Sequence, residues 1–437
     1  MIKYFRFHSI LFISPFLSFV MVKIIVGMSG GVDSSVAALL LQRQGYEVIG
    51  VFMKNYSRTN PATGECSWLD ERRMARRVAA ILEIPLLTID SEAEYCKDVI
   101  DEMYKDYSKG LTPNPDILCN KIIKFPFLWK KARELGASYI ATGHYARVLK
   151  RQGNFNLLMG KDKMKDQSYF LAGLTQKELS HTLFPIGNLT KEEVREIARK
   201  AGFPNWNQKG TTGICFVGKI DMKEFLRRGI KEKKGDVICG GEIVGEHPGI
   251  MFFTIGERIG ERKGIKLEVK FKAKFSNDKF YVTSKLGGNK LVIAREGDAS
   301  LKTSEIKIKK LKWINDLEIN GLKARIRHLG KLYSGRLFES SEFARPQTHG
   351  HARYRLTNYS SVTHSPRPLP LRELACGRVS KWQTPGLLNI AHLSVQRRTK
   401  SETNWIWRFS KGVEGVAPGQ IIVFYKGEKL VGSGEIR

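Results

Sequence analysis

The sequence predicts an α/β domain built on a parallel sheet, followed by a small central domain and a C-terminal β-barrel. Up to about residue 150, short apolar and β-branched runs alternate with helical stretches. This alternation is typical of a parallel sheet with helices on both faces. After about residue 218 the pattern changes to Gly-rich segments and then to short alternating strands, which indicate a small β-barrel.

The elements of the first domain follow one another at regular spacing. The run 22–27 is apolar and β-branched, which suits a buried parallel strand. The next helix is expected to end at Gly45, and two prolines predict a loop around 112–120. Strands are expected at 22–27, 46–53, 84–90 and 137–145, and helices at 36–45, 67–83, 95–109 and 125–136.

The domain boundaries are expected at 22–218, 219–288 and 289–437. A non-periodic stretch at about 338–400 interrupts the last domain. It holds five of the 15 prolines, four of the nine histidines and ten Lys or Arg against three acids. We interpret it as a loop-like or disordered insertion.

Residues 1–21 are expected to lie outside the fold. They are mostly apolar, with a few basic residues and no acids, and they lack a convincing small-residue cleavage site. Met21 directly precedes the first strand, so we favour an extension from a misplaced start. A signal peptide, a membrane anchor and a transit peptide are the alternatives. We expect a cytoplasmic protein without a stable membrane partner, or an organellar one if 1–21 is a transit peptide.

The composition is that of a globular, strongly basic chain. The 437 residues are 42% hydrophobic and 27% charged, with a formal net charge of +30, and the pI is about 9.8. Such a charge favours a polyanionic partner, RNA or DNA first and an anionic membrane second. The simpler alternative is that the charge only keeps the protein soluble.

The six cysteines form no CxxC pair. This argues against a zinc ribbon and against an iron–sulfur site built on such pairs, so no permanently bound metal is expected. Six cysteines are also too sparse for a disulfide scaffold, which indicates a reducing compartment.

A Gly-rich turn, Ser29-Gly30-Gly31-Val32-Asp33-Ser34-Ser35, directly follows the first strand and opens a helix. Glycines let a ligand approach the backbone closely, and a helix N-terminus favours an anion. Asp33 is a candidate to help hold Mg²⁺ on the phosphates. The turn lacks the Gly-Lys-Ser/Thr of a Walker A loop and the GxGxxG spacing. It resembles the PP-loop of the ATP pyrophosphatases, although a tight turn with an Asp/Ser cap is the structural alternative.

Two cysteines lie in unusual settings. Cys119 follows Thr112-Pro113-Asn114-Pro115-Asp116, and Lys121 comes two residues later, so a cation near the thiol favours the thiolate. Cys215 lies in a glycine-flanked segment, 210–218. A lone cysteine is otherwise a small buried apolar residue. From the residues alone both interpretations stay open for these two, and we favour the apolar one for Cys66, Cys96, Cys239 and Cys376.

Seven motifs occur together and in order: SGGVDSS, GVFMKN, TPNPDILCNKIIKF, ATGHYAR, KDQSYFL, TGICFVG and PGQIIVFY. In this combination the chain resembles the tRNA-specific 2-thiouridylases, over residue 22 to about 337 and again over 405–437. The resemblance implies a PP-loop domain of the adenine nucleotide alpha hydrolase-like fold. The chain departs from the family pattern in its first 21 residues and in the long separation between Arg327 and Gln420.

The resemblance also implies roles for individual residues. Cys119, Cys215 and Asp116 would be catalytic, and Cys119 and Cys215 would form a transient disulfide. ATP would be bound by Gly27, Met28, Ser29, Gly30, Gly31, Val32, Asp33, Ser34, Met53 and Gly143. The target base and the tRNA would be bound by Asn114, Pro115, Asp116, His144, Lys165, Asp166, Gln167, Arg327, His328 and Gln420. Without the resemblance, residues 165–167 would be an exposed loop and Arg327-His328 a solvated barrel strand.

The activity implied is the ATP-dependent 2-thiolation of the wobble uridine of tRNA. The base C2 oxygen would be adenylated, and sulfur from a cysteine persulfide would displace AMP after release of pyrophosphate. ATP with Mg²⁺ would be required, and the partners would be tRNA and an upstream persulfide donor, either a cysteine desulfurase or a sulfur-relay protein. The alternatives are another PP-loop enzyme, such as a lysidine synthetase or an amidotransferase-linked synthetase, and an RNA-binding protein with a degenerate ATP site.

Overall fold

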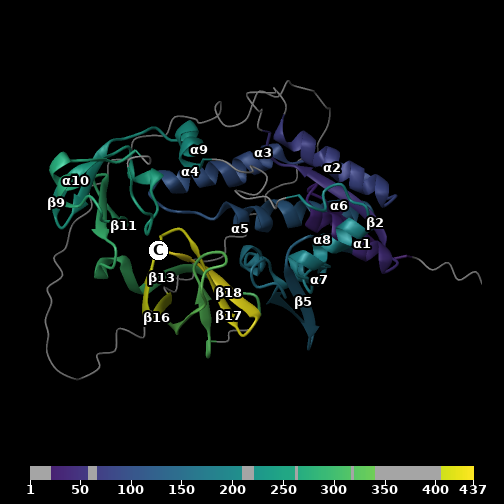
Figure 1. Ribbon diagram of the computed structural model, residues 1–437. Helices are drawn as coiled ribbons and strands as arrows, with labels where there is room; N and C mark the ends of the chain where they lie inside the picture. The colour runs from purple at the N-terminus through teal and green to yellow at the C-terminus, as the bar shows by residue number, and fades with distance from the viewer. Residues whose placement is uncertain (1–20, 58–65, 209–220, 261–263, 316–318, 340–404) are drawn as a thin grey trace, which may run out of the picture.

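The computed structural model describes residues 21–57, 66–208, 221–260, 264–315, 319–339 and 405–437. These residues form three sheets with the helices packed around them (Figure 1). The three sheets correspond to the α/β domain, the central domain and the β-barrel expected from the sequence.

The first sheet is parallel throughout, with strand order β3-β2-β1-β4-β7. Its central strand is flanked by β2 on one side and β4 on the other, so the direction of chain progression reverses there. The carboxyl ends of strands at such a point are where open α/β sheets bind ligands. The strands are β1 (Lys23–Gly27), β2 (Glu47–Lys54), β3 (Leu86–Asp90), β4 (Tyr139–Thr142) and β7 (Thr182–Leu183).

Both faces of this sheet are covered by helices. Ile24 and Val26 face one hydrophobic core, shared with α1 (Val32–Arg43), α2 (Ser67–Ile81) and α8 (Lys191–Lys200). Ile25 faces the other core, shared with α6 (Phe125–Glu134). Successive side chains of a strand point to opposite faces, so a continuous apolar run is buried on both sides.

Three helical segments run end to end on the second face. They are α3 (Glu92–Tyr95), the π-helical η1 (Cys96–Ile100) and α4 (Asp101–Ser108). A second run starts at α5 (Pro115–Cys119), continues as the π-helical η2 (Asn120–Lys124) and ends with α6. The predicted loop therefore stops at Asn114, and both Asp116 and Cys119 lie on a helix.

The central sheet has strand order β10-β9-β8-β12-β11. Its last strand, β12, pairs with both β11 and β8, so the central domain extends to about residue 295 rather than ending at 288 as the sequence predicted. The elements are α9 (Met222–Gly229), β8 (Gly235–Cys239), β9 (Glu242–His247), β10 (Lys266–Leu267), α10 (Val269–Lys274), β11 (Phe280–Leu286) and β12 (Lys290–Arg295).

The third sheet closes on itself in the order β13-β16-β15-β14-β17-β18, with β18 pairing back to β13. Trp407 and Phe424 are fully buried inside this barrel. A hairpin from the first domain, β5 (Ala146–Arg151) and β6 (Asn154–Met159), pairs with β18 and joins the two domains. The barrel strands are β13 (Lys302–Trp313), β14 (Lys323–Arg325), β15 (Tyr333–Glu339), β16 (Trp405–Glu414), β17 (Ile421–Lys426) and β18 (Lys429–Ile436).

The expected insertion falls between two strands that are neighbours in the barrel. Residues 340–404 lie outside the described residues, but Glu339 at the end of β15 is directly opposite Trp405 at the start of β16. The barrel ladder is therefore complete on both sides of this segment.

The remaining short elements are η3 (Ser168–Leu171), α7 (Gln176–Ser180), η4 (Ile250–Phe252) and η6 (Ala299–Leu301). None of the helices in the described residues combines the length and the apolar character needed to cross a bilayer. The expected N-terminal extension lies outside the described residues apart from Met21.

Candidate active site

The Gly-rich turn lies at the carboxyl end of β1 and leads directly into α1. Gly31 is the N-cap of α1 and provides no side-chain cap, so the first amide groups of the helix are left for another acceptor. An uncapped helix N-terminus at the switch point of a parallel sheet is a favourable site for phosphate groups.

Hydrogen bonds within the turn and from outside it hold the turn in shape. The Ser34 hydroxyl donates to the carbonyl of Gly31 at 3.0 Å and accepts from the amide of Ser29 at 3.2 Å. From outside the motif, Asn205 Nδ2 donates to the carbonyl of Gly30 at 2.8 Å. Asn205 is buried, and its role cannot be seen in the sequence, because nothing local links it to a turn 175 residues earlier.

Two glycines of the site are required by close backbone contacts. Gly30 has a φ of +82°, and a Cβ there would lie 2.3 Å from the carbonyl oxygen of Glu71 on α2. A Cβ on Gly143 would lie 2.5 Å from the amide nitrogen of Ser34. The turn is thus closely packed between α2 and the end of β4, and burial raises the pKa of the Glu71 carboxyl to about 7.

Asp33, in the first turn of α1, accepts two hydrogen bonds on one carboxylate oxygen. Lys191 Nζ lies 2.6 Å from Oδ1, and the Tyr145 hydroxyl donates to the same atom at 2.7 Å. The Lys191 side chain is only 8% exposed. The second oxygen, Oδ2, makes no hydrogen bond within the described residues and is available to a metal ion. Burial, together with the charge of Asp33, raises the pKa of Tyr145.

Neither Lys191 nor Tyr145 was identified from the sequence. The available signal was a lysine at the first position of α8, where the helix dipole favours acidic side chains. A cation in that position needs a specific anionic partner, and the partner here is Asp33.

Three other residues expected to bind ATP have buried side chains. Met28, Val32 and Met53 are 1%, 3% and 6% exposed and belong to the two cores beneath the turn. Gly27 lies at the end of β1, where a Cβ would approach Leu128 of α6 at 3.1 Å. These four residues support the turn, while Ser29 is exposed on its surface.

The second candidate element begins at Asn114. This residue is the N-cap of α5, and its side-chain Oδ1 accepts the amide proton of Ile117 at 3.0 Å. Pro115 occupies the first helical position, which its fixed φ favours. The Asn-Pro-Asp sequence thus starts a helix, and Asp116 lies half-buried in its first turn.

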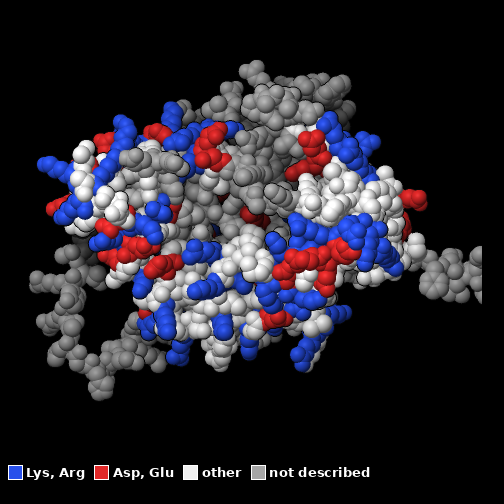
Figure 2. Space-filling view, viewed as in Figure 1, with Lys and Arg blue, Asp and Glu red and all other residues white. Residues whose placement is uncertain are grey.

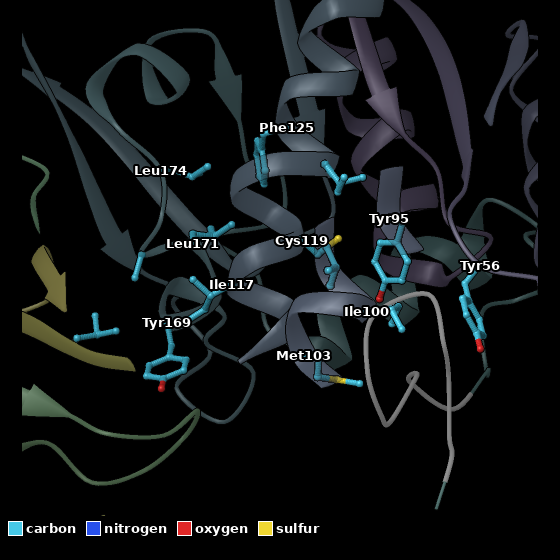
Figure 3. Close-up of a cluster of buried hydrophobic side chains, with 14 of the residues drawn as sticks. Tyr56, Tyr95, Ile100, Met103, Ile117, Cys119, Phe125, Tyr169, Leu171 and Leu174 are labelled. Atoms are coloured by element: carbon cyan, nitrogen blue, oxygen red, sulfur yellow. The ribbon is translucent and has the colours of Figure 1, made fainter. Parts of the chain in front are cut away.

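Cys119 ends this short helix and is completely buried. Figure 3 shows it inside a cluster of apolar side chains, with Tyr95 on one side and Ile117 and Leu171 on the other. Its sulfur is a reduced thiol. The second expected catalytic cysteine, Cys215, lies outside the described residues.

Cys96 differs from its expected role as a plain apolar residue. It is buried on η1 in the same core as Cys119. It is disulfide-bonded.

His144 connects the two candidate elements. Its Nδ1 lies 2.7 Å from Thr142 Oγ1 at the end of β4, and its ring stacks on Phe125 with the centroids 5.9 Å apart. Phe125 continues the helical run that carries Cys119. Burial and the charge of Lys124 hold the pKa of His144 well below its ordinary value, so the ring is neutral.

Both accessory domains contact the segment that leads into α5. Lys285 of the central domain donates to the carbonyl of Gly110 at 2.8 Å. The amide of Thr112 donates to the carbonyl of Pro418 in the barrel, also at 2.8 Å. Burial lowers the pKa of Lys285 to about 8. The start of the Cys119 helix is therefore held from two sides by parts of the chain far away in sequence.

Known protein families match the three domains of this chain in the same order. Three family models match in order: the tRNA methyl transferase HUP domain over residues 22–219, the tRNA methyl transferase PRC-barrel domain over 223–295, and the aminomethyltransferase beta-barrel domain over 391–436. The tRNA-specific 2-thiouridylase MnmA 1 of Geobacillus kaustophilus (strain HTA426) is 36% identical over 413 residues, which cover 94% of this chain and 94% of that protein.

The chain belongs to the tRNA-specific 2-thiouridylase family.

Another member of the 2-thiouridylase family covers less of the chain. The tRNA-specific 2-thiouridylase MnmA of Nitrosomonas eutropha (strain DSM 101675 / C91 / Nm57) is 52% identical over 238 residues, which span 54% of this chain and 65% of that relative. A solved 4-thiouridine synthetase–RNA complex with bound ATP matches 45% of this chain and 46% of that chain, with 18% identity and a TM-score of 0.31, too low to support an argument.

Within this 2-thiouridylase-family chain, the expected tRNA contacts at 165–167 have different environments. Lys165 is exposed. Asp166 is completely buried, pairs with Arg325 of the barrel at 2.7 Å and accepts the amides of Gly160 and Ser168. Gln167 bonds to the backbone of Tyr145 through its side chain and its amide. The expected contact of tRNA with the Asp166 side chain does not fit its burial, and this residue instead joins two domains.

The barrel residues expected to contact tRNA include two buried polar atoms without partners. Arg327 is exposed. The His328 ring packs against Phe170 in a tilted arrangement with the centroids 4.2 Å apart, and burial lowers the pKa of His328. Within the described part of the chain, neither His328 Nδ1 nor Gln420 Oε1 has a hydrogen-bond partner. Buried polar atoms of this kind are usually satisfied, so each is available to a ligand.

Proposed function

We propose that this chain catalyses the ATP-dependent 2-thiolation of the wobble uridine of tRNA. One relationship carries the proposal. The helical run begins at Asn114-Pro115-Asp116, passes through Cys119 and reaches Phe125. Phe125 stacks on His144 beside the Gly-rich turn. An element suited to a nucleophilic thiol and an element suited to a triphosphate are thus built on one support.

ATP is the first substrate in this proposal. Its phosphates would lie at the uncapped N-terminus of α1, where the amide groups and the helix dipole favour negative charge. Gly143 allows the end of β4 to pack directly against the amide of Ser34 at this helix terminus. Mg²⁺, bound through the available Oδ2 of Asp33, would supply neutralisation of the phosphate charge.

The chemical steps follow from the activation of a poor leaving group. The C2 oxygen of a uridine, flipped out of its stack, attacks the α-phosphate, and pyrophosphate leaves. The adenylated oxygen can then be displaced at C2, and AMP departs. Lys191 holds Asp33 in place in the first of these steps.

The sulfur steps use two thiols. A persulfide on Cys215, loaded by an upstream sulfur donor, attacks C2 through its terminal sulfur. The Cys119 thiolate then attacks the sulfur of Cys215, which releases the 2-thiouridine and leaves a Cys119–Cys215 disulfide for a reductant to reopen. Asp116, half-buried on the helix that carries Cys119, is suited to proton transfer during these steps.

The burial of Cys119 means that its thiol can react only after substrate binding changes its surroundings. A thiol enclosed by apolar side chains is protected from solvent oxidants until substrate binding changes its surroundings. We propose a cytoplasmic enzyme, with an organellar one as the alternative if residues 1–21 are a transit peptide.

A different PP-loop enzyme is the first rival. Such an enzyme would adenylate another group and would not require Cys119. The second rival is an RNA-binding protein that no longer uses ATP. Against it stands the half-buried Asp33 carboxylate held by the buried Lys191 and Tyr145, a group that a mere binding surface does not need.

The deciding experiment is nucleoside mass spectrometry of unmodified tRNA incubated with the full chain, MgATP and a persulfide source. We expect 2-thiouridine to appear together with stoichiometric pyrophosphate and AMP. Cys119→Ser should yield none, and Cys239→Ser, at a thiol in the central domain, serves as the matched control. Pyrophosphate release without 2-thiouridine would favour another PP-loop enzyme, and tRNA binding without pyrophosphate release would favour the RNA-binding protein.

A further inference from the structure

A group of lysines gathers where the Cys119 helix meets the barrel. Lys121 lies two residues after Cys119, at the start of η2, and Lys310 and Lys312 lie near the end of β13. Figure 2 shows how widely Lys and Arg side chains are spread over one face of the molecule. The members of this group, in contrast, converge on one place, where η2 meets β13.

The fold brings Lys121 and Lys312 close together on either side of Ala172 and Gly173. Lys312 is directly opposite Ser433 in the β13–β18 ladder, and the Ser433 hydroxyl donates to the carbonyl of Ala172 at 2.9 Å. The next residue, Gly173, packs against the stem of Lys121, where a Cβ would lie 3.0 Å from Lys121 Cβ. The side chain of Lys121 is therefore directed along Gly173 toward β13.

A local distortion of β13 contributes to this arrangement. The β13–β18 register shifts between Lys309 and Lys312, and Lys310 has a φ of +54°, which is uncommon for a residue with a side chain. Bulges of this kind redirect side chains and are frequent beside functional sites. Three lysines, Lys309, Lys310 and Lys312, lie at this bulge of β13.

The charges of this group are not balanced. Lys309 and Lys310 both pair with Glu435, at 2.8 and 3.1 Å. Asp106 of α4 interacts electrostatically with both Lys310 and Glu435. Lys121 and Lys312 pair with no carboxylate among the described residues, and their amines contact each other. Burial first, and then the neighbouring amines of Lys312 and Lys310, lower the pKa of Lys121.

We propose that Lys121 and Lys312 together bind one backbone phosphate of the RNA substrate, beside the nucleotide presented to Cys119. This inference rests on the proposed function. It locates the RNA backbone between the helix that carries Cys119 and the barrel. A phosphodiester between the two amines supplies the missing negative charge. Because the contact is to phosphate, it positions the RNA and does not read its sequence.

The test is tRNA binding by the full chain, measured by fluorescence anisotropy between 50 and 200 mM salt. The variants are Lys121→Gln, Lys312→Gln and the double variant, and Lys290→Gln on the central domain is the matched control for the loss of one positive charge. One lost phosphate contact lowers the log–log salt slope by about 0.7–0.9. The affinity lost over this salt range should therefore shrink by about threefold relative to the unmodified chain.

Two features make the expected result specific. Because both lysines bind one phosphate, the double variant should change the slope by about one contact rather than two. Lys121→Arg should retain most of the affinity. The affinity for ATP and the temperature of thermal unfolding should be unchanged in every variant. These two measurements separate the loss of an RNA contact from a folding defect.

Three outcomes would overturn the proposal. One is a double variant that keeps the slope and affinity of the unmodified chain. Another is a change equal to that of Lys290→Gln. The third is that inorganic phosphate protects both amines from acetylation as effectively as tRNA does, which would indicate a site for the free anion. Absence of 2-thiouridine despite a normal lysine-dependent salt slope would instead contradict the proposed function and leave the RNA site standing.

Discussion

Lys191 Nζ lies 2.6 Å from Asp33 Oδ1, in a pair whose lysine side chain is only 8% exposed. The pair joins the first turn of α8 to the first turn of α1 across 158 residues of sequence. Loss of Asp33 would leave the buried Lys191 charge poorly solvated, and loss of Lys191 would release the half-exposed Asp33 from its fixed position, so this contact is expected to be important for both stability and function.

Replacing Lys191 with Met should impair ATP use. Asp33 would lose its cationic partner and its fixed position, at a cost of about 1.5–3 kcal/mol, so tRNA-dependent pyrophosphate release should fall by about tenfold or more. Lys200→Met, at the exposed end of the same helix, is the matched control. Normal pyrophosphate release by Lys191→Met, with the Mg²⁺ dependence unchanged, would show that the pair has no part in ATP use.

Gly30→Ala should be far more damaging than Gly31→Ala. A side chain at Gly30 meets the Glu71 carbonyl at 2.3 Å and must adopt a φ of +82°, whereas at Gly31 it would only touch Ser29 Oγ at 3.5 Å. The sequence pointed to phosphate approach as the reason for this glycine, and the structure adds the close contact with α2. We expect a loss of about 1–3 kcal/mol in the free energy of unfolding and of ATP binding for the first variant only. Equal behaviour in denaturant titration would contradict this.

Cys119→Ser and Cys215→Ser should each abolish 2-thiouridine formation, because serine supplies neither a persulfide nor an easily formed thiolate. ATP binding should persist, since Cys119 lies outside the Gly-rich turn. A buried hydroxyl costs about 1–3 kcal/mol, so Cys119→Ala is needed to separate chemistry from stability. Full thiolation of tRNA by either variant at Cys119 would refute its role as a nucleophile.

Lys285 should make stability depend on alkaline pH. Its pKa is about 8 in the folded chain against an ordinary 10.5, so the unfolded chain binds more protons between these values. The free energy of unfolding should therefore rise as the pH increases from about 8 to 10.5, by up to about 3 kcal/mol. Lys285→Met should lack this rise, and it should lower thiolation more than ATP binding because the Gly110 contact is lost. Identical pH profiles of thermal unfolding for the two proteins would count against the assignment.

Replacing residues 340–404 with a short turn should leave the barrel folded. Glu339 and Trp405 are already paired, so a short connection suffices, and the entropic cost of a loop depends only weakly on its length. We expect the fluorescence of the buried Trp407 and the unfolding temperature to be nearly unchanged, and thiolation to be retained. Loss of tRNA affinity in a protein that still folds would show instead that the segment binds RNA.

The sequence by itself determined the strand and helix order of the first domain and the nature of the Gly-rich turn. These features depend on neighbouring residues: β-branched runs form buried strands, and glycines after a strand allow a tight turn into a helix. Two prolines predict a loop at Asp116 and Cys119, but both residues lie on a helix. Here Asn114 caps the helix and Pro115 occupies its first position, where proline is favoured.

Only the tertiary structure decided which distant residues complete the site. Lys191, Tyr145 and Asn205 reach the Gly-rich turn, and Lys285 and Pro418 hold the entry to the Cys119 helix, from separate elements and domains. The burial of Asp166 against Arg325 likewise could not be seen in an apparently exposed loop. Local composition specifies local conformation, but the pairing of two charges far apart in sequence depends on how sheets and helices pack, which no short motif encodes.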